Sequence, residues 1–258
     1  MRSRTRFPGP LQSLPFKTIA RLPLITFCLI LSYFAYSQDD VVLNDTLDIK
    51  TKTFLLPNRT ASGEFRQMIS ATRYFLPSDW TNIAVNAPMF NYIARISLPL
   101  GFSVEGSIST LVVSNKFMLS PRWTYSRNNF HAGVSYQYGY NLGFLNDRGF
   151  STLVTAWSRL PSISVGYSFP RSAITLKAGL EYIGDIFYQT GENVTRSSNF
   201  KLNGGFIGAV LEQRLTKQHL MTFGFEINHV NFVMLAWPAF PVNNKTYYVP
   251  QVTWGYTL

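Results

Sequence analysis

The stretch YYVPQVTWGYTL, residues 247–258, alternates between two kinds of side chain. Successive side chains of a β-strand point to opposite faces, so this alternation predicts a strand with one apolar and one mostly polar face. The apolar set is Tyr248, Pro250, Val252, Trp254, Tyr256 and Leu258, and the set between them is Val249, Gln251, Thr253, Gly255 and Thr257.

The same alternation recurs upstream. Phe90, Tyr92 and Ile96 share one parity, whereas Asn91 and Arg95 share the other. Residues 150–159 alternate poorly, so their faces cannot be assigned. About ten strands are predicted, with eight or twelve as alternatives, near residues 89–98, 102–112, 117–125, 130–141, 150–159, 162–169, 174–182, 200–212, 221–228 and 247–258.

A secretion signal is predicted at residues 1–37. Five basic residues precede an apolar run at residues 22–34, and Ala35-Tyr36-Ser37 supplies small residues for cleavage before Gln38. An uncleaved anchor is the alternative, but this run is shorter than the roughly 20 residues that a helical span needs. Cys28, the only cysteine, lies inside the signal. The mature chain is therefore expected to have no disulfide and no cysteine metal site.

Composition narrows the class of protein. Aromatic residues make up 16% of the chain and charged residues 14%, against about 25% charged residues in ordinary soluble domains. After the signal, no run of apolar residues is long enough for a helical span. The sequence therefore predicts an all-β fold, a transmembrane antiparallel up-and-down β-barrel, with a secreted soluble β-sandwich as the alternative.

The region between signal and strands, residues 38–88, is predicted to be a periplasmic segment with a short amphipathic helix at residues 62–75. Ser62 can cap this helix, and Phe65, Met68, Ile69 and Thr72 follow helical spacing. The predicted domains are thus the signal at 1–37, this segment at 38–88, and the barrel at 89–258.

The predicted signal, the alternating strands from Phe90 onward and the terminal Trp254, Tyr256 and Leu258 resemble the outer-membrane β-barrel proteins of Gram-negative bacteria. The resemblance implies an outer-membrane location, contact with its lipid, and help from periplasmic chaperones. It also implies that the barrel-assembly machinery reads the three terminal residues as an insertion signal. A girdle at the membrane interface is expected from Trp123, Tyr136, Tyr138, Tyr140, Tyr167 and Tyr182.

Strand order also predicts which connections share an end of the barrel. The two longest, near residues 185–199 and 230–245, both follow odd-numbered strands, so both are expected at the extracellular end.

The polar face of the predicted strands carries charged residues of both signs, and these are predicted to point into the lumen. A barrel of this size has a narrow interior, so these charges are expected to pair as a structural network. Alternatively, they form a selectivity ring whose positive excess favours anions. The predicted network comprises Arg95, Glu105, Arg122, Lys177, Glu181, Lys201 and Glu226.

Enzyme chemistry finds little support in the sequence. Among His131, His219 and His229, only His131 shares the inward parity, and Ser135 lies about 13 Å farther along its strand. This distance is too long for the hydrogen bond that a lipid hydrolase built from His131, Ser135 and Glu105 would need between its serine and histidine. A lipid-modifying enzyme stays the alternative function. A protease at the rim would have only Asp147 and Asp185.

Nucleic-acid binding, metals and cofactors find no support in the sequence either. Five of the 23 Lys+Arg and none of the 13 Asp+Glu lie in residues 1–37, so the mature chain carries +5. These basic residues are scattered, so no nucleic-acid partner is expected. No metal or cofactor is expected, and no motif identifies a ligand. The predicted function is a non-enzymatic outer-membrane barrel, either a small passive channel or a structural and surface-interaction protein.

Overall fold

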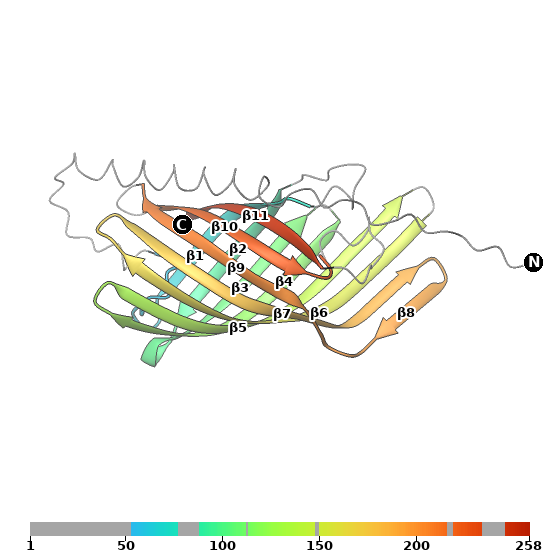
Figure 1. Ribbon diagram of the computed structural model, residues 1–258, viewed down its shortest axis with the longest axis horizontal. Helices are drawn as coiled ribbons and strands as arrows, with labels where there is room; N and C mark the ends of the chain where they lie inside the picture. Colours follow the sequence, from blue (N-terminus) through green and yellow to red (C-terminus); the bar gives the residue numbers. More distant parts are fainter. Residues whose placement is uncertain (1–52, 77–87, 112, 148–149, 216–218, 234–245) are drawn as a thin grey trace, which may run out of the picture. The chain divides into compact units, whose positions relative to one another are not determined.

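The computed structural model describes residues 53–76, 88–111, 113–147, 150–215, 219–233 and 246–258 (Figure 1). The predicted signal peptide and its cleavage site lie outside these residues. Within them, eleven antiparallel strands and one 3-10 turn follow one another along the chain. Their bounds are β1 (Phe65–Tyr74), β2 (Met89–Ser97), η3 (Pro99–Gly101), β3 (Phe102–Leu111), β4 (Ser114–Arg127), β5 (Phe130–Asp147), β6 (Phe150–Ser168), β7 (Ser172–Thr190), β8 (Asn193–Ser197), β9 (Lys201–Arg214), β10 (Leu220–Val230) and β11 (Tyr247–Thr257).

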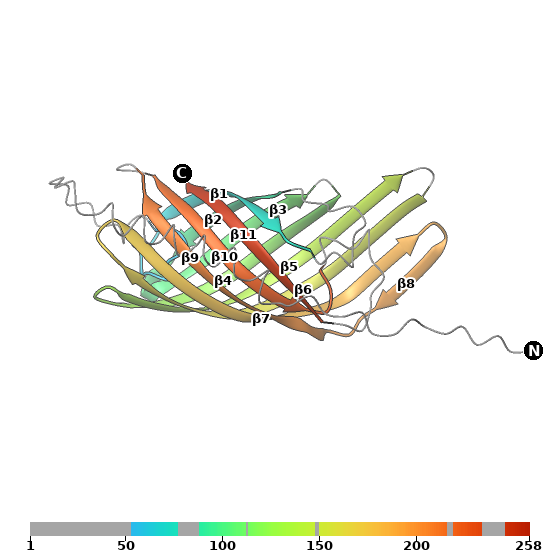
Figure 2. The ribbon, with the colours of Figure 1, turned by 45° about the horizontal axis from the view of Figure 1, so that its top comes forward.

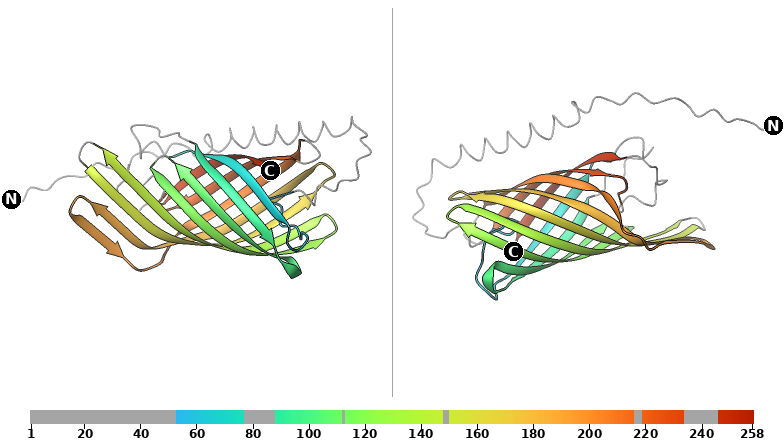
Figure 3. Two further views of the ribbon diagram at one scale, coloured as in Figure 1. Left: turned by 180° about the vertical axis from the view of Figure 1, so that it is seen from behind. Right: turned by 60° about the horizontal axis from the view of Figure 1, so that its bottom comes forward.

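Ten of these strands close into a ring. Each strand from β1 to β7 pairs with the next, β7 pairs with β9, and β9, β10 and β11 follow in order until β11 pairs with β1. Strand β8 pairs only with the far end of β7 and stands outside the ring. The tilted view in Figure 2 and the view from behind in Figure 3 agree on this ring. The predicted closed, antiparallel, ten-stranded barrel is therefore confirmed for the described part of the chain.

The first strand corrects the predicted helix at residues 62–75. Residues 65–74 form β1, which pairs with β2 on one side and β11 on the other. The four residues with helical spacing also divide by parity: Phe65 and Ile69 are exposed on the outer face, whereas Met68 and Thr72 are buried inside. Without β1, the edges of β2 and β11 would have no partners, and unpaired backbone groups are costly in a membrane. The barrel thus begins at β1, well before the predicted boundary at residue 89.

A second correction concerns the predicted strands near 150–159 and 162–169. They form one strand, β6, in which Pro161 interrupts the alternation without ending the pairing with β5. The predicted number of ten is correct because this merger removes one strand and β1 adds one. The poor alternation at the start of β6 also has a reason. There Val154 and Ala156 face inward into a small apolar cluster with Ile183, so apolar residues interrupt the polar inner parity.

A bulge reverses the expected orientation of two side chains in β9. The pairing of β9 with β7 skips Asn203 between Leu202 and Gly204. A single inserted residue changes which parity faces inward. The alternation predicts that Phe206 and Val210 share the outer face of Leu202, but both line the interior.

The outer face of the ring is apolar. Large hydrophobic side chains are exposed along nine of the ten strands of the ring and are half-buried on β10, whereas the inner parity carries buried Ser, Thr, Asn and charged residues. In a soluble β-sandwich, the apolar faces of two sheets would instead be buried against each other. The sandwich alternative is therefore wrong, and the chain is an integral membrane β-barrel of the outer-membrane type. Within the described ranges, no helix is long and apolar enough to cross a membrane.

The two ends of the barrel differ. At one end, the short-turn end, strands are joined by tight connections such as η3 and residues 128–129. Gly101 of η3 has φ +83°, and a Cβ there would collide with the carbonyl oxygen of Thr124. The opposite end, the long-connection end, carries the connection with β8 and the one between β10 and β11. Both long connections therefore share one end, as predicted, and its extracellular orientation stays a prediction.

Beyond the ring, β5, β6, β7 and β8 continue as an extension at the long-connection end (Figure 1). β5, β6 and β7 have 18 or 19 residues each, against 9 to 14 in the other strands of the ring.

The lipid-facing assignment predicts the effect of a charge on the outer wall. Ile207 in β9 is 64% exposed, so an Ile207→Arg barrel should lose about 2–4 kcal/mol of unfolding free energy in lipid vesicles if the site lies near the bilayer centre. Urea unfolding followed by tryptophan fluorescence measures this, with Ile207→Leu as the matched control. Equal stability of the two variants would contradict a lipid-facing Ile207.

Candidate functional site in the barrel lumen

A short piece of chain before β1 occupies the lumen. Residues 53–58, hereafter the plug segment, include Thr53, Phe54, Leu56 and Pro57, all of which are fully or almost fully buried. The segment has no strand pairing with the wall. It is held by side chains of the surrounding strands.

Glu212 of β9 makes the main contact with the plug segment. Its side chain is fully buried, and its Oε1 accepts hydrogen bonds from the backbone N–H groups of Phe54 and Leu55 at 2.6 and 3.0 Å. Its Oε2 accepts a third bond from the N–H of Leu56 at 2.7 Å. Consecutive N–H groups that converge on one anion form a nest, and a carboxylate is the ligand such a nest prefers. The main chain of the plug segment thereby supplies three hydrogen bonds to one buried charge.

Cations of the wall bind the carbonyl side of the same segment. Arg66 Nη1 donates to the carbonyl oxygen of Thr53, and Arg122 Nη2 donates to that of Leu55 at 3.1 Å. The guanidinium of Arg95 lies 4.5 Å from the centre of the Phe54 ring. The polar groups of a segment without ladder pairing are thus met by charged side chains of the barrel.

Glycines of β5 and β6 give the plug segment its room. A Cβ on Gly133 would lie 2.9 Å from Pro57 Cβ, and a Cβ on Gly166 would collide with Leu56. Both glycines lie on the inner parity, next to the short-turn end. The backbone of the wall therefore forms part of the plug's seat.

Above the plug segment, the lumen contains a cavity of about 280 Å³. Leu55 lines it, whereas Thr124 and His131, closer to the short-turn end, do not. The plug segment thus forms the floor of the cavity. At the long-connection end, the lining includes Phe232 and Val233.

Asn203, the bulge residue of β9, holds Phe232 in place. Its side-chain amide donates to the carbonyl oxygen of Phe232 at 2.8 Å and accepts from the Phe232 N–H at 3.0 Å. Asn203 Nδ2 also donates to Glu181 Oε2 at 2.6 Å. The bulge thereby couples the rim of the lumen to a charged residue of the cavity.

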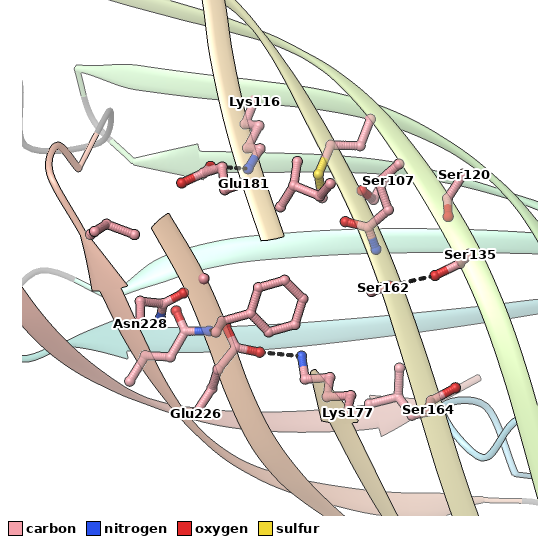
Figure 4. Close-up of a pocket in the computed structure, with 18 of the residues that line it drawn as sticks. Ser107, Lys116, Ser120, Ser135, Ser162, Ser164, Lys177, Glu181, Glu226 and Asn228 are labelled. Carbon is pink, nitrogen blue, oxygen red and sulfur yellow. Dashed lines mark hydrogen bonds and ion pairs between the residues drawn. The ribbon is translucent and has the colours of Figure 1, made fainter. Parts of the chain in front are cut away.

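The structure brings six of the seven predicted network residues to the lumen. Arg95 donates through Nε and Nη2 to Glu105 Oε2 at 3.2 and 2.8 Å, and Arg122 Nη1 lies 4.0 Å from the same oxygen. Lys177 Nζ lies 2.5 Å from Glu226 Oε2, and the two side chains point toward each other in Figure 4. The predicted pairing of opposite charges is therefore observed, and it matches the cost of leaving buried charge unpaired.

Two residues differ from the predicted network, and both change the balance of positive and negative charge in the lumen. Lys201 is exposed at the start of β9 and does not line the cavity. Lys116 of β4, which was not among the predicted residues, lies inside and approaches Glu181 Oε1 at 3.9 Å. The cavity is therefore lined by Lys116, Arg122 and Lys177 against Glu105, Glu181 and Glu226. Among the described residues that line the cavity, cations and carboxylates are equal in number, so these residues do not supply the positive excess that the anion-selective alternative needs.

The candidate hydrolase group that the sequence disfavours, His131, Ser135 and Glu105, does not assemble in the structure. His131 is 1% exposed, and its Nδ1 and Nε2 lie 3.0 and 3.2 Å from the hydroxyls of Ser126 and Ser168. Ser135 instead shares a 2.7 Å hydrogen bond with Ser162, and Glu105 binds Arg95. Of the rim carboxylates, Asp185 occupies a strained backbone position with φ +47° at the β6–β7 bulge. In the described ranges, no group of three or more His, Cys, Asp or Glu is placed to hold a metal.

The predicted girdle and insertion residues face outward. Trp157, which was not in the predicted set, stacks on Tyr138 with ring centres 4.9 Å apart and lies at the same distance from Tyr140. The role of the girdle residues at a membrane interface and the role of the terminal residues in barrel insertion stay predictions. Exposed side chains of these two sets are Trp123, Tyr136, Tyr138, Tyr167, Trp254 and Leu258.

Sequence reasoning missed the plug segment and its anchor Glu212. A parity count along β9 from Leu202 places Glu212 outside, and the bulge at Asn203 reverses this. Lys116 could have been found, because it shares the parity of Arg122 along β4. The plug segment leaves no periodic signal in the sequence.

The buried pair predicts a stability difference between two cations that the sequence treats alike. Arg95→Met leaves Glu105 without its two hydrogen bonds, so unfolding free energy should fall by about 3–5 kcal/mol. Lys201→Met, at the exposed position, should change it by less than about 0.5 kcal/mol. Denaturant unfolding in micelles measures both. Similar losses in the two variants would contradict the different environments of these residues.

The close approach of Pro57 to Gly133 predicts that a larger side chain at position 133 disturbs the plug segment. Gly133→Val forces a side chain into the space of Pro57, so amide hydrogen exchange at Phe54, Leu55 and Leu56 should accelerate at least tenfold. Gly106→Val is the matched control, because a Cβ at Gly106 meets nothing within 4 Å. Unchanged protection of these three amides in a folded Gly133→Val barrel would show that the seat is not needed.

No protein-family model and no curated protein matches this chain. Among solved structures, it is similar to the translocator domain of the autotransporter NalP from Neisseria meningitidis, with a TM-score of 0.41, 10% identity, and coverage of 91% of this chain and 95% of that one. It is also similar to a KdgM porin (TM-score 0.37, 10% identity, 74% and 97% coverage). A third similar structure is outer membrane phospholipase A from Escherichia coli (TM-score 0.37, 10% identity, 75% and 89% coverage). Likeness at this level does not distinguish a channel from an enzyme.

Proposed function

We propose that this outer-membrane barrel is a non-enzymatic passive pore for small solutes, held closed by the plug segment. The observation that carries the proposal is the fully buried Glu212, whose carboxylate accepts three consecutive backbone N–H groups of that segment. A barrel interior needed only for structure can be filled with wall side chains. Here a separate piece of chain fills one end and a cavity occupies the rest.

The way the plug is attached supports reversible opening. The plug segment lies before β1 and contributes no strand pairing to the ring. Its departure would break contacts with Glu212, Arg66 and Arg122 but no ladder hydrogen bond of the wall. The barrel can therefore stay closed against lipid while the lumen opens.

The charges that line the cavity point to weak ion selectivity in the open pore. Among the described residues that line the cavity, three cations each lie near one of three carboxylates. A lumen of balanced charge gives no strong preference for anions or cations. We therefore propose a small selectivity ratio in place of the anion preference that the selectivity-ring alternative implied.

The lipid-modifying alternative receives little support from these positions. An enzyme that acts on membrane lipid needs its nucleophile and base within reach of the lipid-facing surface. His131 is buried inside, beside the plug segment, and its ring nitrogens lie near Ser126 and Ser168.

Surface interaction is the second candidate, and the extension favours it. All five residues of β8 are exposed, and β8 is paired on one side only, with β7. An edge strand presents free backbone groups to a partner. This role can coexist with a pore.

Single-channel recording in planar bilayers tests the proposed function. The unaltered protein should be closed with rare openings, whereas Glu212→Gln, which loses the charge that the nest binds, should raise the open probability at least tenfold. Glu226→Gln is the matched control, because it removes a lumen carboxylate away from the plug segment and should affect selectivity more than opening.

A stronger variant keeps the test decisive. Combining Glu212→Gln with replacement of residues 54–57 by Gly-Ser-Gly-Ser removes both the carboxylate that binds the plug backbone and the four side chains that fill this end of the lumen. A folded, heat-modifiable barrel of this kind that remained silent would contradict the pore. A steadily open unaltered protein, indifferent to Glu212→Gln, would contradict the plug.

A further inference from the structure

We infer that the cavity above the plug segment is a binding site for one small, neutral, polyhydroxylated solute of monosaccharide size. The inference rests on the proposed closure of the lumen, because the plug segment is the floor that turns a passage into a pocket. It goes beyond pore function in naming the chemical class that the wall recognises.

The size of the cavity limits the ligand. Its volume of about 280 Å³ lies just below the range of about 300–1,000 Å³ typical of pockets for drug-sized molecules. It equals the liquid volume of roughly nine waters. One hexose fits such a space, whereas a disaccharide or a lipid headgroup with its glycerol does not.

One side of the cavity is a wall of hydroxyl groups. Strands β3 to β6 present serines at inward positions that follow one another around the barrel (Figure 4). A hydroxyl both donates and accepts, so such a wall can match the hydroxyls of a sugar in several orientations. The serines are Ser107, Ser120, Ser135, Ser162 and Ser164.

Two polar atoms on the other side of the cavity lack a partner within the protein. Thr175 of β7 is 2% exposed and lines the cavity, and its Oγ1 makes no hydrogen bond. The Oε1 of Gln251 in β11 is likewise buried without a partner, although its Nε2 donates to Glu226. Buried polar groups are nearly always satisfied, so each unsatisfied one calls for an external partner. A ligand with several hydroxyls supplies partners to both.

The charges favour a neutral ligand. Lys177 is paired with Glu226, and Lys116 lies near Glu181. An anionic ligand would compete with these carboxylates for the lysines and leave carboxylate charge uncompensated. A neutral hydroxyl can instead donate to a carboxylate or accept from an ammonium group without separating the pairs.

An aromatic surface completes the site. Phe206 lines the cavity, and its ring centre lies 5.7 Å from Lys177 Nζ. The negative face of an aromatic ring attracts weakly positive C–H groups, which a sugar ring presents on one side. Phe206 faces the lumen only because of the bulge at Asn203, so the fold departs from regular alternation to place this ring.

Saturation-transfer difference NMR on the full-length mature protein in detergent micelles tests the inference. The probes are glucose, the anion gluconate and the cation glucosamine, each up to 100 mM. Glucose should give the strongest transfer, with at least fivefold weaker binding of gluconate. Thr175→Val should weaken glucose binding at least threefold, and Ser135→Leu, which fills the cavity, should abolish it. Thr222→Val is the matched control, because Thr222 is buried inside the barrel but does not line the cavity.

Several outcomes would overturn the inference. One is no glucose transfer to the folded protein, as expected for a cavity that holds only water. Others are preferred binding of gluconate, or glucose binding that survives both Ser135→Leu and Thr175→Val. Because Thr175→Val alone preserves side-chain shape, a folding failure of Ser135→Leu does not remove the test. The proposed pore is judged separately by the conductance of the variant without plug side chains, so either proposal can fail alone.

Discussion

Closure of the strand ring by β1 and β11 is the constraint on which the rest of the structure depends. The hydrocarbon core of a membrane contains no water, so a backbone N–H or C=O group without a protein partner there makes no hydrogen bond. Seven residue pairs, from Met68–Thr257 to Tyr74–Gln251, join the first strand to the last and remove both edges of the sheet. This requirement overrides the helical spacing in β1.

A closed ring of ten strands leaves a narrow interior, and this explains the lumen chemistry. Every second residue of each strand must point inside, so polar and charged side chains meet those of opposite strands. Arg95 and Glu105 are directly opposite in the pairing of β2 with β3, whereas Lys177 and Glu226 come from strands that are not neighbours. Opposite charges in the lumen are thus brought together in two ways, by the register of neighbouring strands and by the closure of the ring, which brings strands that are not neighbours close to each other.

The plug segment follows a different physical rule from the wall. The wall satisfies its backbone by strand pairing, whereas the plug satisfies its backbone with the side chains of Glu212, Arg66 and Arg122. Such contacts can be exchanged one at a time, but a strand cannot leave the ring without exposing two edges. The same barrel therefore combines a wall that is costly to open with a lumen whose closure depends on a few charged groups.

The sequence by itself determined the class of fold, because alternation is a local property and each strand of a membrane barrel must display it. Eight of the ten predicted strands, the outward apolar faces and the shared end of the two long connections could be read from parity alone. Six of seven predicted lumen charges followed in the same way, and Lys201 failed because it lies at an exposed strand start that does not line the cavity.

Only the tertiary structure decided the matters that depend on strands meeting across the barrel. Phe65, Met68, Ile69 and Thr72 follow helical spacing, and the need to pair β2 and β11 nevertheless selects a strand. One skipped residue in β9 turns Phe206 and Glu212 inward. The nest of Phe54, Leu55 and Leu56 around Glu212 joins residues more than 150 positions apart. No local pattern encodes such a contact, because it exists only when the ring has closed around it.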